Sequence, residues 1–152
     1  MLGHIFMETT KISPGKTIGE VQGVLAAYGA NNILIEYDNT EVSALSFTYK
    51  VEDQAIAYRL PSNWQVIYEK LAERKKRFRG HTKDDLIDQA KRIAWRTVLR
   101  WVEAQLAFVE QGQGKVEQVF MHCMIVGPNK QTLFQKMEES KWHLKQLKDI
   151  NR

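Results

Sequence analysis

Basic side chains are concentrated in one part of this 152-residue chain, and such a concentration attracts polyanions. Residues 70–100 hold eleven basic and four acidic residues, a net charge of +7 in a chain whose total is +4. Nucleic acid is the commonest polyanion in a cell, so this basic window indicates a nucleic-acid-binding surface. The alternative is a solvated helix whose charges bind nothing.

Three arginines of the basic window follow one another at helical spacing. Arg92, Arg96 and Arg100 stand at positions i, i+4 and i+8, so on a helix they form one stripe. Successive positions would be about 6 Å apart along the axis, a distance comparable with the phosphate spacing of an extended single strand. The alternative is that carboxylates of the same chain, with Glu103 as a candidate, neutralise the stripe.

Aromatic residues accompany these cations. Guanidinium groups hold phosphates while rings stack on bases, a combination that suits single-stranded nucleic acid. Phe78 lies within a basic run and Trp95 borders the stripe, although such rings more often belong to a core. The predicted nucleic-acid-binding residues are Arg74, Lys75, Lys76, Arg77, Phe78, Arg79, Lys83, Arg92, Trp95, Arg96 and Arg100.

Residues that would carry catalysis form no complete pattern. The four histidines show neither HExxH nor HxH spacing, so we expect no metal site. Cys123 is the single cysteine, and the side chain of its neighbour His122 would point in a different direction on a strand or a helix. A buried structural cysteine is therefore favoured over a nucleophile. We expect no catalytic residue and no cofactor.

One acidic cluster allows a further interpretation. His81 lies close in sequence to Asp84, Asp85 and Asp88, and these side-chain types bind the divalent cation of a nuclease. A capping box between Thr82 and Asp85, with acidic residues in the first turns of a helix, explains the aspartates more simply. A metal-dependent nuclease therefore ranks third among the functional interpretations.

Apolar periodicity predicts the strands that must support these residues. Alternation of apolar and polar side chains predicts strands at 43–51 and 54–60, and a short apolar run predicts another at 33–37. The links between them are short, which favours an antiparallel meander with one face on the core.

Helical periodicity predicts the remaining elements. A capping box between Thr17 and Glu20 opens the first helix, and Ser62 is expected to cap the second. Residues 121–126 fit a buried strand as well as the end of a short helix. The predicted helices cover 17–28, 63–78, 83–111, part of 115–126, and 131–147.

The helix at 83–111 carries a wide apolar sector and is expected to be central to the fold. Trp101 lies near the middle of that sector, and the arginine stripe lies opposite. Trp95 and Leu99 fall on the border between the two. This helix should therefore present Arg96 to solvent and Trp101 to the core.

The expected fold class is α+β, with a small three-stranded antiparallel sheet packed against several helices, one of them long and central. Residues 1–15, which end in Ser13-Pro14-Gly15, are predicted to be a flexible arm, and residues 16–152 a single domain. One cysteine excludes an internal disulfide. The chain has no apolar run of about 20 residues and no secretory signal, so we expect a cytoplasmic protein without a membrane partner.

Several short segments resemble a group of proteins from bacteriophage and prophage genomes. They are Arg92-Ile93-Ala94-Trp95-Arg96, the run from Trp101 to Ala107, Arg59-Leu60-Pro61, Val119-Phe120 and Thr132-Leu133-Phe134. The resemblance covers most of residues 16–138. Those proteins are mostly without assigned function, so it implies a small phage protein in the bacterial host cytoplasm and no catalytic residue. Binding of single-stranded DNA is a common task in that setting.

The leading functional prediction is non-enzymatic binding of nucleic acid, with single-stranded DNA favoured over other forms and little sequence specificity. The alternative is a protein–protein adaptor or structural oligomer of a phage, in which Trp95, Phe134 and Trp142 are buried at an interface. The sequence leaves DNA versus RNA, strand preference and oligomeric state open.

Overall fold

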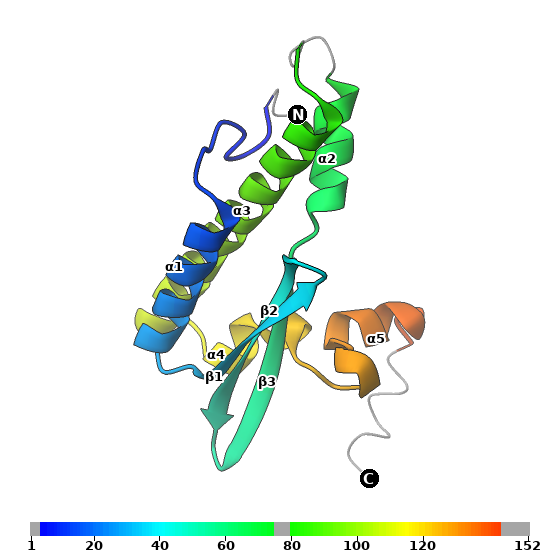
Figure 1. Ribbon diagram of the computed structural model, residues 1–152. Coiled ribbons are helices and arrows are strands. Elements are labelled where there is room, and N and C mark those ends of the chain that lie inside the picture. The colour runs from blue at the N-terminus through cyan, green and yellow to red at the C-terminus, as the bar shows by residue number, and fades with distance from the viewer. Residues whose placement is uncertain (1–3, 75–79, 144–152) are drawn as a thin grey trace.

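The computed structural model describes residues 4–74 and 80–143, and it has the predicted α+β fold (Figure 1). A three-stranded antiparallel sheet, in the order β1-β2-β3, lies against helices of which α3 is the longest at 28 residues. The elements are α1 (Pro14–Ala27), β1 (Asn31–Asp38), β2 (Glu41–Val51), β3 (Gln54–Pro61), α2 (Trp64–Glu73), α3 (Lys83–Glu110), α4 (Val116–Val119), the 3₁₀ turns η1 (Met121–Cys123) and η2 (Pro128–Lys130), and α5 (Leu133–Glu139).

The sheet is the predicted meander, and its two edges differ. β2 and β3 pair in continuous register, whereas the register of β1 with β2 shifts at two places. Along the outer edge of β3, the backbone N–H of Ile125 donates to the carbonyl of Ala57 at 2.8 Å. The segment after η1 therefore adds a short strand-like pairing to β3, so residues 121–126 combine both of the alternatives that periodicity left open.

Helix α3 joins two hydrophobic clusters. The larger lies between α1, the inner face of the sheet and the second half of α3, and its centre is aromatic: Phe47 stacks on Tyr58 at 5.4 Å and meets Phe120 edge-on. The smaller lies between α2 and the first half of α3, where Leu71, Ala90 and Ile93 are buried. Figure 1 shows α2 beside one end of α3 and α1 beside the other.

The buried side of α3 differs from the predicted sector. Trp95 is 2% exposed and Leu99 is fully buried, although the sequence places both at a border. Trp101, expected near the centre of the core, is half-buried and meets the edge of Phe120 at 5.5 Å. The reason is that α1 and α2 both pack on α3, and the larger cluster joins α3 to the sheet as well, so the buried residues of α3 do not fall in one apolar sector.

The chain before α1 packs along α3. The first helix starts at Pro14 and not at Thr17, because the hydroxyl of Ser13 caps it by accepting the N–H of Lys16. Upstream of it, the side-chain amide of Gln89 donates to the carbonyls of Glu8 and Thr10, at 2.8 and 2.9 Å. These hydrogen bonds use backbone acceptors, so they leave no periodic pattern in the sequence of this segment.

The C-terminal part is more broken than predicted. Thr82 and Asp85 form the expected capping box of α3. Of the helix predicted at 131–147, the described residues form α5, of seven residues, opened by a capping box between Thr132 and Gln135; residues 144–147 lie outside the described residues. Between α3 and α5 the chain makes short turns, with Asn129 in the left-handed region at a φ of 56°. These turns let the segment fold back over the end of β3.

Candidate functional site

Arg96, the middle residue of the predicted stripe, lies against α1. Its Nη1 donates to the carboxylate of Glu20 at 2.7 Å and lies 3.4 Å from the hydroxyl of Thr17. The Arg96 side chain is only 8% exposed. The prediction that Arg96 faces solvent is therefore wrong, and neutralisation by a carboxylate of the same chain is confirmed at this position, with Glu20 as the partner.

Two other arginines of the predicted site also have carboxylate partners. Arg100 donates to both oxygens of Glu103, at 3.0 and 3.1 Å, as the alternative interpretation expects. Arg74 donates to Glu8 at 3.2 Å. An exposed pair such as Arg100 with Glu103 is open to competition from another anion, whereas the Arg96 pair is not.

The remaining predicted residues divide into three groups. Arg92 donates to the neutral amide oxygen of Gln89, at 2.7 and 2.9 Å, so its charge is kept, and Lys83 is exposed in the first turn of α3. Trp95 is in the core, where no base can reach its ring, so its predicted border position is wrong. Lys75, Lys76, Arg77, Phe78 and Arg79 lie outside the described residues.

The fold thus reduces the charge of the basic window. Four carboxylates from outside the window pair with four of its cations, and they belong to Glu8, Glu20, Glu41 and Glu103. The net excess of +7 counted along the sequence is more than halved when these neighbours are included. A linear charge count therefore overstates the field that this surface presents.

The candidate catalytic residues have structural roles. Burial raises the pKa of the Cys123 thiol to about 11, so it stays protonated at neutral pH, as a buried structural cysteine should. The backbone N–H of Thr82 donates to Asp85 at 2.9 Å and lowers the pKa of that carboxyl. Across residues 4–74 and 80–143, no three His, Cys, Asp or Glu side chains gather into a group that could hold a metal ion, the cluster around His81 included.

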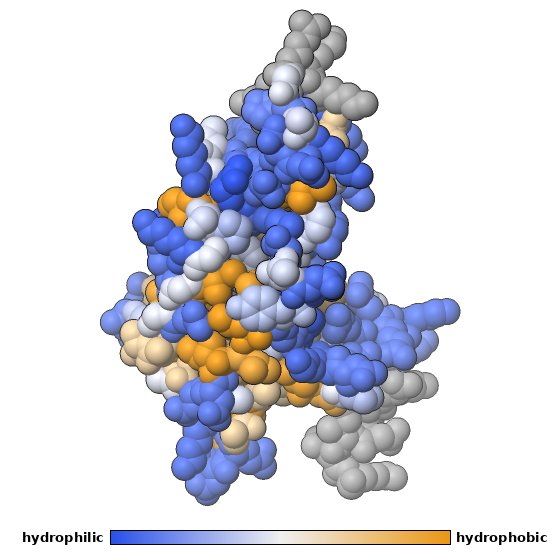
Figure 2. Space-filling view, viewed as in Figure 1, coloured by the Kyte–Doolittle hydropathy of each residue, from blue (hydrophilic) through white to orange (hydrophobic). Residues whose placement is uncertain are grey.

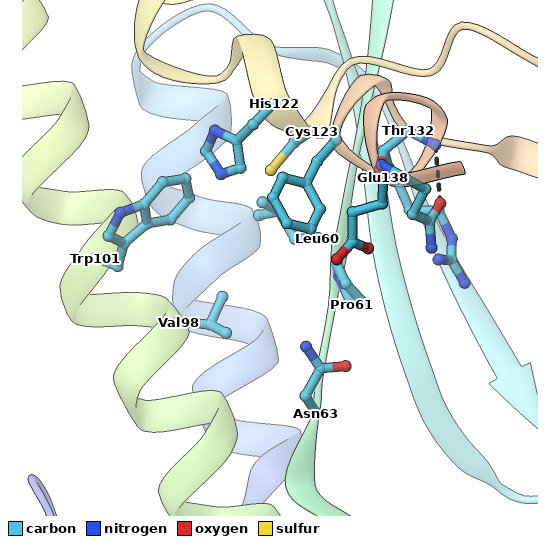
Figure 3. Close-up of a pocket in the computed structure, with 12 residues that line it drawn as sticks. Leu60, Pro61, Asn63, Val98, Trp101, His122, Cys123, Thr132 and Glu138 are labelled. Carbon is cyan, nitrogen blue, oxygen red and sulfur yellow. Dashed lines mark hydrogen bonds between the residues drawn. The ribbon is translucent and has the colours of Figure 1, made fainter. Parts of the chain in front are cut away.

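One hollow near these elements is a groove between α3 and α5, here called the α3–α5 groove. Its volume is about 560 Å³. In Figure 3, Val98 and Trp101 enter from α3, His122 and Cys123 from η1, and Leu60 and Pro61 from the end of β3. The full lining is Arg59, Leu60, Pro61, Asn63, Val98, Trp101, His122, Cys123, Thr132, Phe134, Gln135 and Glu138.

A limited area of apolar surface lies among polar residues on the face shown in Figure 2. Figure 2 shows a hydrophobic area in the middle of the view, below the polar surface of the α2 end. Phe134 lines the groove, and its ring meets that of Trp142, which lies outside the lining, edge-on with centroids 5.6 Å apart. Both rings are largely open to solvent, at 44% and 54% exposed. This pair therefore presents two large aromatic side chains beside an apolar hollow.

The polar groups of the groove are unequally compensated. Arg59 donates through Nε to Glu36 at 2.8 Å, and Lys130 pairs with the same carboxylate, so two cations share one carboxylate. Burial alone would raise the pKa of Glu36, but hydrogen bonds from Lys130 and Arg59 lower it on balance. Glu138, whose carboxylate points into the groove in Figure 3, forms no ion pair with any residue in the described part of the chain.

Sequence reasoning misses most of this groove. Residue type places Phe134 and Trp142 at an interface, but periodicity assigns Trp101 to the core and gives Glu138 no role. The lining comes from α3, β3, η1 and α5, which lie far apart along the chain. Periodicity within one element cannot predict that these elements come together, because their contact depends on the turns between α4 and α5.

Comparisons with protein-family models, with curated proteins and with solved structures give no match to this chain. The phage-type resemblance therefore stays a prediction. In the described ranges, no helix is both long enough and apolar enough to cross a bilayer.

Proposed function

We propose that the protein is a non-enzymatic adaptor that binds another protein chain through the α3–α5 groove. The observation that carries the proposal is the exposed pair of Phe134 and Trp142 beside an apolar hollow. Aromatic side chains dominate the binding energy of protein interfaces, where they fill such hollows. A volume of about 560 Å³ lies within the range of about 300–1,000 Å³ that is usual for binding pockets.

A peptide-library selection tests the adaptor even though the partner is unidentified. Displayed twelve-residue peptides are selected on the wild-type protein and then measured against Phe134→Ala. The matched control is Phe6→Ala, since Phe6 is also an exposed phenylalanine, at 58%, but belongs to the N-terminal segment. We expect the selected peptides to bind the wild type and the control, and to lose at least tenfold in affinity for Phe134→Ala. Equal binding to all three proteins would contradict the adaptor proposal.

Binding of single-stranded DNA is the second candidate, supported by the cations that keep their charge. Arg92 contacts the neutral Gln89, and Lys83 has no ion pair in the part of the chain that the structure describes. Phosphate contacts fall away with salt at a slope of roughly −0.7 per contact for single strands. This site is smaller than the sequence predicts, because Arg96 and Trp95 are withdrawn into the fold.

A titration with single- and double-stranded oligonucleotides at two salt concentrations tests this candidate. We expect Arg92→Ala combined with Lys83→Ala to weaken binding several-fold and to reduce the salt slope. Lys50→Ala combined with Lys115→Ala is the control, because it removes the same charge from two exposed lysines outside the basic window. An oligonucleotide affinity that does not change with salt concentration, or no binding at low salt, would contradict the nucleic-acid candidate.

A further inference from the structure

We propose that the α3–α5 groove selects a segment in which an arginine stands next to an apolar side chain. The inference rests on the proposed function and adds the chemistry of the partner. The groove combines two aromatic side chains, Trp101 and Phe134, with the carboxylate of Glu138. Flat rings and a carboxylate are the groups that recognise a guanidinium, while the apolar floor accepts its neighbour.

Charge complementarity favours a cation over an anion. Within the lining, Arg59 is engaged by Glu36, which it shares with Lys130, whereas Glu138 has no ion pair in the described ranges. His122 also faces the groove, where its ring meets Trp101 edge-on at 5.4 Å. Partial burial lowers the pKa of His122, so at pH 7 this ring adds no positive charge beside Glu138.

The apolar part of the site lies against the centre of the fold. Leu60 and Cys123 are buried, and Val98 is half-buried, so the floor is held by residues that pack on the larger hydrophobic cluster. Pro61 ends β3 at the same place and has no N–H to satisfy. A floor of this kind gains affinity from an apolar side chain but gives no preference of its own for charge.

Arginine fits this arrangement better than lysine. Its planar guanidinium stacks on an aromatic face and donates two parallel hydrogen bonds to one carboxylate. Lysine carries the same charge as a compact, strongly hydrated ammonium, which does neither. The site should therefore rank an arginine peptide first, a lysine peptide second and a glutamate peptide last.

Three matched peptides test the ranking: acetylated and amidated Gly-Phe-Arg-Leu-Gly and its lysine and glutamate counterparts. Binding is followed through the indole N–H signal of Trp101 in NMR spectra, assigned by its loss in Trp101→Phe. We expect the arginine peptide to bind the wild type about fivefold more tightly than the glutamate peptide, as suits a partly exposed ion pair. Glu138→Arg should reverse that order.

Glu139→Arg is the matched control, because Glu139 is the next residue of α5 and accepts a hydrogen bond from Gln131 outside the groove. It makes the same charge change and should leave the order as in the wild type. If all three peptides bind equally and Glu138→Arg changes nothing, while Phe134→Ala abolishes binding, the arginine inference is overturned and the adaptor stands. If none of the peptides moves the Trp101 signal, the arginine inference is overturned, and the library selection still decides on the adaptor.

Discussion

The basic window and the α3–α5 groove lie on the same long helix, and they differ in what the fold leaves available. In the window, Arg96, Arg100 and Arg74 each donate to a carboxylate of the same chain. In the groove, Phe134 and Glu138 contribute an exposed ring and an unmatched charge. Among the described residues, several of the cations that gave the sequence signal are thus paired within the chain, whereas groove residues with little sequence signal face solvent. Charge density along a sequence is a poor guide to charge that a partner can reach.

The largest loss of stability should come from replacing Trp95. This substitution distinguishes a core role for the ring from stacking on the bases of DNA. Because Trp95 is fully packed in the core, Trp95→Ala should lower the free energy of unfolding by about 3–5 kcal/mol. Trp142→Ala is the control, since the exposed Trp142 should change stability by about 0.5 kcal/mol or less. Urea denaturation of both variants measures this. A stable Trp95→Ala protein that loses DNA binding would restore the stacking interpretation.

A smaller loss is expected at Arg96. Removing this buried cation leaves Glu20 and Thr17 without their partner, so Arg96→Ala should cost about 1–3 kcal/mol, between the values for exposed and fully buried pairs. Arg100→Ala, which breaks an exposed pair, should cost about 0–1 kcal/mol. The two variants differ only in which arginine is removed, and thermal or urea unfolding compares them. Equal losses would mean that burial does not distinguish the two positions.

The smallest expected effect concerns His122 at the groove. Burial holds its pKa in the folded protein below the unfolded value, so the unfolded chain binds more protons as the pH falls through the range near 6. Stability should therefore drop as the pH is lowered from 7 towards 5. His122→Gln should make that drop shallower.

The comparison of His122→Gln with the wild type is made at two pH values. At pH 8 both side chains are neutral, so any difference there reports packing against Trp101 alone. The change in that difference between pH 8 and pH 5 isolates the protonation of His122. Parallel pH profiles for the two proteins would show that the groove does not disfavour the charged imidazole.

The elements of the fold could be predicted wherever the signal is local. The capping box of Thr82 with Asp85 marks the start of α3, and the alternation in β2 and β3 marks the meander. The pairing of Arg96 with Glu20 could not be predicted, because 76 residues separate the two and no local pattern in either segment indicates its partner. The short α5 escapes prediction for a related reason: its apolar residues have helical spacing, but turns around it stop the helix after seven residues.

The candidate site is less predictable than the fold. Its exposed aromatic pair is suggested by the residue types of Phe134 and Trp142, since aromatic side chains are common at interfaces. Its floor is not, because Leu60, Val98 and Cys123 look like ordinary core residues until the chain folds back after η1. Concavity is a property of several elements together, and composition and periodicity describe one element at a time.

The two edges of the sheet have a consequence for how the protein behaves at high concentration. An unpaired, regular strand edge offers a template on which other chains can add as further strands, and ordered aggregates grow in that way. The edge of β3 is partly covered by Ile125, and the edge of β1 is broken by its two register shifts and by Asn32, whose φ is 46°. Irregularity of this kind bends an edge away from a straight partner. The irregular geometry of β1 therefore disfavours edge-to-edge growth. Deleting one residue at a register shift of β1, so that its pairing with β2 becomes continuous, should lower the protein concentration at which aggregation begins.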